Sequence, residues 1–180
     1  MLTRRKRSTR CLTAAAICAA LGVVLLALGA FVEVLDLSAA AMASFLIIFA
    51  VIELRGKWPY LIYAVTALLS LLLLPIKSPA VVYALLLGHY PILKEILERR
   101  CPRIVAWVLK ILLFNVALAV TLVLSFFLLM PGVPIFEGAY GYVWIIFCTP
   151  VFLLYDVALT RLITFYLRRL RHRIGFLRNF

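Results

Sequence analysis

Long apolar runs, separated by short segments that hold most of the charges, constrain the fold of this chain more than any other feature of its sequence. An α-helix needs about 20 residues to cross ~30 Å of hydrocarbon at about 1.5 Å per residue. Hydrophobic residues make up 67% of the 180-residue chain and charged residues 14%, whereas a soluble domain has about a quarter of its residues charged and under half apolar. This excess of apolar side chains indicates an integral membrane protein.

We predict an all-α fold, a polytopic membrane protein with a bundle of six transmembrane helices. The predicted spans are Thr9–Val34, Ser38–Leu54, Trp58–Leu74, Pro79–Glu98, Arg103–Met130 and Tyr142–Leu167. The first run is longer than the usual 7–15-residue core of a signal peptide, so we expect an uncleaved span. Pro91 closely follows Gly88 within the fourth span, and a proline removes a backbone hydrogen bond, so a kink or break is expected near Gly88. The predicted parts are a basic N-terminus (1–8), the transmembrane domain (9–167) and an arginine-rich tail (168–180).

The distribution of basic residues predicts the orientation in the membrane. Six spans place both termini on one side, and that side then carries 17 of the 19 lysines and arginines. Because cytoplasmic loops are enriched in basic residues, we expect a multi-pass protein of the cytoplasmic membrane with both termini in the cytoplasm. The lysines and arginines lie in short segments between the apolar runs rather than on one basic binding face, which argues against nucleic acid as a partner. We expect the arginine-rich tail to contact anionic lipid, with docking of a protein partner as the alternative.

Polar residues deep in the predicted spans are the candidates for a functional site. Measured along the helix axis at ~1.5 Å per residue, Asn115 and Asp156 each lie about 18 Å from the basic residue at the inner end of their span, and His89 lies about 16 Å from it. These basic residues are Arg103, Arg168 and Arg100. The three polar residues are therefore expected at a similar depth in the membrane. The predicted cluster consists of His89, Tyr90, Lys110, Asn115 and Asp156. It could tie helices together, which would stabilise the bundle by about 0.6–2 kcal/mol per contact. Alternatively, it could bind a ligand, a proton or a cation.

Small residues in the first span predict a close helix contact. Ala15 and Ala19, like Ala16 and Ala20, are four residues apart, so each pair lies on one side of the helix. Motifs of common enzymes are missing. The four cysteines form no C-x-x-C pair, and no histidine lies at metal-ligand spacing from them. We therefore expect no catalytic residues, no metal site and no cofactor.

The layout of the chain resembles the substrate-capture subunits, or S components, of energy-coupling-factor vitamin transporters. Six spans in fewer than 200 residues, the basic start and the small-residue pattern of the first helix carry this resemblance. The segments Val51–Leu54, Gly88–Lys94 and Leu109–Asn115 also resemble small bacterial six-span membrane proteins. S components bind a solute near the outer face and dock through the first helix onto a transmembrane coupling subunit driven by ATPases. The resemblance implies that Ala15, Ala16, Ala19 and Ala20 form the docking surface.

We therefore expect a non-catalytic solute-capture subunit of a multi-subunit, ATP-driven importer, with the lipid bilayer, a coupling subunit with its ATPases and a small-molecule ligand as partners. The sequence matches no vitamin-specific pattern, so the ligand stays open. The alternative is a structural or scaffolding membrane protein. In that case the polar cluster locks helices together and the basic tail contacts lipid or a partner.

Overall fold

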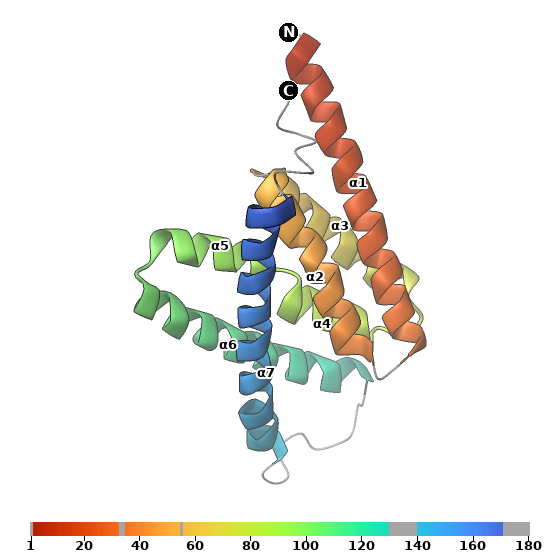
Figure 1. The fold of residues 1–180 in the computed structure, drawn as a ribbon. Helices are drawn as coiled ribbons and strands as arrows, with labels where there is room; N and C mark the ends of the chain where they lie inside the picture. The colour runs from red at the N-terminus through yellow and green to blue at the C-terminus, as the bar shows by residue number, and fades with distance from the viewer. Residues whose placement is uncertain (1, 33–34, 55, 130–139, 171–180) are drawn as a thin grey trace. The chain divides into compact units, whose positions relative to one another are not determined.

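The computed structural model describes residues 2–32, 35–54, 56–129 and 140–170, which form helices and no strand (Figure 1). The helices are α1 (Leu2–Phe31), α2 (Asp36–Glu53), α3 (Trp58–Leu73), α4 (Ser78–Val82), α5 (Tyr90–Arg100), α6 (Arg103–Leu129) and α7 (Tyr140–Phe165). The π-helix η2 (Tyr83–Leu87) continues α4, and the π-helix η3 (Tyr166–Leu170) continues α7. The all-α prediction is confirmed for this part of the chain.

Five segments are long and apolar enough to cross a membrane. They are Thr9–Phe31, Asp36–Glu53, Ser78–Arg100, Arg103–Leu124 and Phe147–Arg168. The remaining predicted span, Trp58–Leu74, corresponds to α3, which is apolar but has only 16 residues. At ~1.5 Å per residue such a helix is about 24 Å long, shorter than the hydrocarbon core. The five segments indicate a multi-pass membrane protein in contact with lipid. A membrane span at α3, and with it the count of six spans, stays a prediction, as does the cytoplasmic position of the termini.

The chain forms two compact units, Met1–Val133 and Pro134–Phe180. The first unit contains α1 to α6, and the second contains α7 and η3. The predicted division into 1–8, 9–167 and 168–180 stays a prediction. Residues 171–180 of the arginine-rich tail lie outside the described residues.

Small residues let α1 approach both α2 and α3. A Cβ atom placed on Gly29 would lie 2.5 Å from the Cβ of Ala39 in α2, and one placed on Gly22 would lie 2.9 Å from the Cγ2 of Thr66 in α3. Both distances are shorter than van der Waals contact, so any larger residue would push the helices apart. In a membrane, where lipid is as apolar as the side chains, such close packing is a main source of helix association.

The α5 and α6 helices form an antiparallel hairpin. They lie side by side in the first unit, and their turn projects beyond α2 and α4 (Figure 1). Arg99 and Arg100 end α5, and Pro102 precedes the first residue of α6, where its missing N–H costs no helical hydrogen bond.

Candidate functional site

The predicted break near Gly88 is present and has a defined structure. The segment from Ser78 passes from α4 into η2, and the amide of Gly88 donates to the carbonyl of Tyr83 at 2.7 Å, five residues back. The chain then bends at Gly88 and His89 before α5 begins at Tyr90. Pro91 has no amide hydrogen to donate to Leu87, which explains why the regular helix cannot continue. Single π-helical turns of this kind occur often at functional sites.

Tyr63 of α3 packs against the break and satisfies one of its carbonyl groups. Its hydroxyl donates to the carbonyl of Ala84 at 2.6 Å. Its ring lies 6.2 Å from the ring of Tyr83 and 6.4 Å, edge-on, from the ring of His89. A Cβ on Gly88 would lie 2.7 Å from the carbonyl of Tyr83 and 3.0 Å from the Tyr63 ring. The bend therefore requires glycine at position 88.

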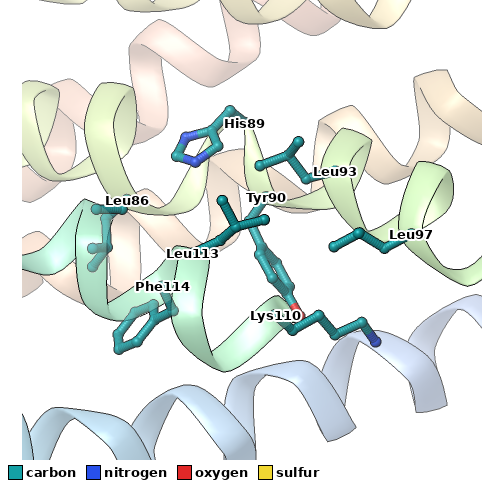
Figure 2. A pocket seen from close by; sticks show the side chains of 9 residues that line it. Leu86, His89, Tyr90, Leu93, Leu97, Lys110, Leu113 and Phe114 are labelled. Atoms are coloured by element: carbon teal, nitrogen blue, oxygen red, sulfur yellow. The ribbon is translucent and has the colours of Figure 1, made fainter. Parts of the chain in front are cut away.

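A small cavity lies next to the break, between η2, α5 and α6 (Figure 2). Its lining residues are Leu86, His89, Tyr90, Leu93, Leu97, Lys110, Leu113, Phe114 and Ala117. The structure thus brings together three members of the predicted cluster, His89, Tyr90 and Lys110. The cavity has a volume of about 10 Å³, enough for roughly one water molecule.

Two buried lysines share one carboxylate beside this cavity. The Nζ of Lys110 in α6 lies 2.6 Å from Oε1 of Glu98, and the Nζ of Lys94 in α5 lies 3.2 Å from the same oxygen. The side chain of Lys110 is 3% exposed and that of Lys94 is 2% exposed, whereas the side chain of Glu98 is 47% exposed. The Lys110 ammonium also lies 5.4 Å from the centre of the Trp107 ring, within the range of a cation–π contact. We call Lys94, Glu98 and Lys110 the lysine–glutamate cluster.

Sequence reasoning missed two members of this cluster. From the sequence, Lys94 is one of the bases that predict the orientation, and Glu98 is the last residue of the fourth predicted span. Their four-residue spacing on one helix is a signal for an ion pair. Only the packing of α5 against α6, however, shows that Lys110 reaches the same oxygen.

Of the other two predicted polar residues, Asn115 does not line this cavity, and Asp156 belongs to the other unit. Asn115 lies in α6, where its side-chain amide donates to the carbonyl of Ile111 in the same helix at 2.8 Å. Asp156 lies in α7, in the second unit, where its backbone carbonyl accepts a hydrogen bond from Thr160 at 2.9 Å. A cluster that includes Asp156 therefore stays a prediction.

The small-residue pairs of α1 differ in exposure. Ala15 and Ala19 are buried, whereas Ala16 and Ala20 are exposed. The first pair therefore faces the protein interior, and only the second pair is accessible to a partner. Docking through this helix stays a prediction.

Over the described residues, no group of three or more His, Cys, Asp or Glu side chains could hold a metal ion. Comparisons with protein families, curated proteins and solved structures find no match. A function for this chain must therefore be argued from its own residues.

Proposed function

We propose that this chain is a non-catalytic solute-capture subunit of a multi-subunit, ATP-driven importer similar to energy-coupling-factor transporters. The observation that carries the proposal is the interrupted apolar segment Ser78–Arg100, whose break lies beside a cavity lined by His89, Tyr90 and Lys110. In transporters, interrupted membrane helices commonly form the substrate site because their backbone polar groups can face a ligand.

Buried charge at this position supports binding. Moving an ammonium group into a membrane protein costs free energy, and ionisable residues within spans usually serve a solute or ion. Lys94 and Lys110 lie within two candidate spans and are almost fully buried. In the proposed function, the charge of Lys110 becomes available at one end of the cavity when the cavity opens, while His89 and Tyr90 provide polar groups at the break.

The cavity must open to admit a solute. Its present volume of about 10 Å³ is far below the roughly 300 Å³ of a typical ligand pocket. We place the hinge at Gly88 and His89, since α5 can turn there without breaking a regular helical ladder. Movement of α5 away from α6 would enlarge the cavity and stretch the bond between Lys110 and Glu98.

Retention of a small molecule tests the capture role. The chain is purified gently in mild detergent, and bound molecules are identified by mass spectrometry. We expect a retained solute in the native chain and in the control Lys57→Met, which removes an exposed lysine. We expect loss of the solute in Lys110→Met. The variant Tyr90→Phe keeps the ring and the packing, so reduced retention there would show that the hydroxyl takes part.

Association with a coupling subunit tests the importer role. Leucine substitutions at Ala16 and Ala20 would enlarge the accessible face of α1 without entering the interior. They should abolish co-purification with ATPase-linked subunits, whereas Val24→Leu, at another exposed position of the same helix, should not. Unchanged association of the double-leucine variant would argue against this docking face.

A structural or scaffolding membrane protein is the second candidate. It is favoured by the small cavity and by the ion pairs that join α5 to α6 within the protein. On this reading the lysine–glutamate cluster locks the hairpin, and neither a retained solute nor an ATPase-linked partner should be found.

A further inference from the structure

We propose that the turn between α5 and α6 binds an anionic phospholipid, with its phosphate held by Arg99, Arg100 and Arg103. This inference does not depend on solute capture, because it concerns an exposed surface outside the cavity. These three residues, which we call the arginine turn, are all exposed. Their side chains form no hydrogen bond or ion pair with any residue of the described chain.

The acidic residues of the hairpin do not neutralise the arginine turn. Between Lys94 and Lys110 the sequence carries five basic and two acidic residues, a net charge of +3. Glu98 directs Oε1 toward Lys94 and Lys110. This internal use of the carboxylate leaves the three guanidinium groups available to an outside anion.

Phosphate matches the chemistry of this turn. A guanidinium group is planar, is always charged and can donate two parallel hydrogen bonds to phosphate oxygens. The arginines lie within five residues where two helices meet, so several of them can approach one headgroup. Each basic residue near an anionic membrane surface strengthens binding by about fivefold.

The neighbouring surface of α6 identifies the source of the phosphate as a lipid. Ile104 and Val108 are 80% and 61% exposed, and their four-residue spacing places them on one side of the helix. Trp107 is also exposed and lies four residues after Arg103, which places the two residues on the same side of the helix. An acyl chain can lie along this apolar stripe while its phosphate contacts the arginines. Inorganic phosphate has no apolar part that could contact this stripe.

Native mass spectrometry of the full chain with phosphatidylglycerol and phosphatidylethanolamine in equal amounts tests the proposal. The test variant replaces Arg99, Arg100 and Arg103 by glutamine. The control replaces Arg10, Lys57 and Arg161, three exposed bases outside the arginine turn and the arginine-rich tail, by glutamine and so has the same net charge. We expect native chain and control to retain phosphatidylglycerol with at least about a tenfold preference, and the test variant to lose most of that preference.

Three results would overturn the inference. If the test variant and the control lose the preference for phosphatidylglycerol equally, the binding depends on net charge rather than on a site. Displacement of phosphatidylglycerol by an equal concentration of inorganic phosphate would show that the acyl chains contribute nothing. Displacement by an acidic peptide at that concentration would identify a protein segment as the better occupant. Because both variants change exposed side chains only, unchanged circular dichroism is expected for both and confirms that they fold.

Discussion

Replacement of Glu98 by glutamine would remove the carboxylate that joins Lys94 and Lys110 while keeping the size of the side chain. Exposed ion pairs contribute about 0–1 kcal/mol to stability, whereas removing one partner of a fully buried pair costs about 3–5 kcal/mol. Both lysines are nearly fully buried, but Glu98 is 47% exposed. We therefore expect Glu98→Gln to lower the free energy of unfolding by about 2 kcal/mol, between these limits.

The free energy of unfolding can be measured by titrating the purified chain from mild detergent into a denaturing detergent and following helix content by circular dichroism. The matched control is Glu95→Gln, which removes an exposed carboxylate from the same helix. We expect the control to change stability by less than about 0.5 kcal/mol. The double variant Glu98→Gln/Lys110→Met removes both partners of the shorter bond, so its loss should be about 1 kcal/mol smaller than the sum of the two single losses.

Two outcomes would refute the argument that this carboxylate stabilises the hairpin. One is a Glu98→Gln variant no less stable than Glu95→Gln. The other is strict additivity in the double variant, which would mean that Glu98 and Lys110 do not interact energetically despite their 2.6 Å separation.

Three further substitutions test other parts of the structure. Tyr63→Phe removes the donor to the Ala84 carbonyl and should lower the free energy of unfolding by about 1 kcal/mol, measured in the same titration. Gly29→Val places a Cβ atom 2.5 Å from the Ala39 Cβ. We expect this overpacking to lower the free energy of unfolding by about 1–3 kcal/mol, and an equally stable variant would contradict the close approach of α1 and α2. Asp156→Asn separates the two roles of that residue. If its charge binds a solute, the variant should lose solute retention, whereas if the side chain only ties helices together, solute retention and the free energy of unfolding should stay unchanged.

Much of the architecture follows from local sequence properties. Apolar runs predict the helices because a segment in lipid must satisfy its backbone hydrogen bonds internally. The break near Gly88 follows from Pro91, which removes a backbone donor wherever the segment is placed. The hydrogen bond from Tyr63 to the carbonyl of Ala84 at this break could not be predicted, since it joins residues 21 positions apart in sequence.

The sequence by itself determined that the chain is helical and apolar enough to occupy a membrane, and that its fourth segment is interrupted, because hydropathy and proline act along the chain. Only the tertiary structure decided that Lys94 and Lys110 share one oxygen of Glu98, and that Ala15 and Ala19 point inward while Ala16 and Ala20 stay accessible. The physical reason is that burial and ion pairing depend on which helix faces which. Two helices with the same spacing of small or charged residues can pack through different sides.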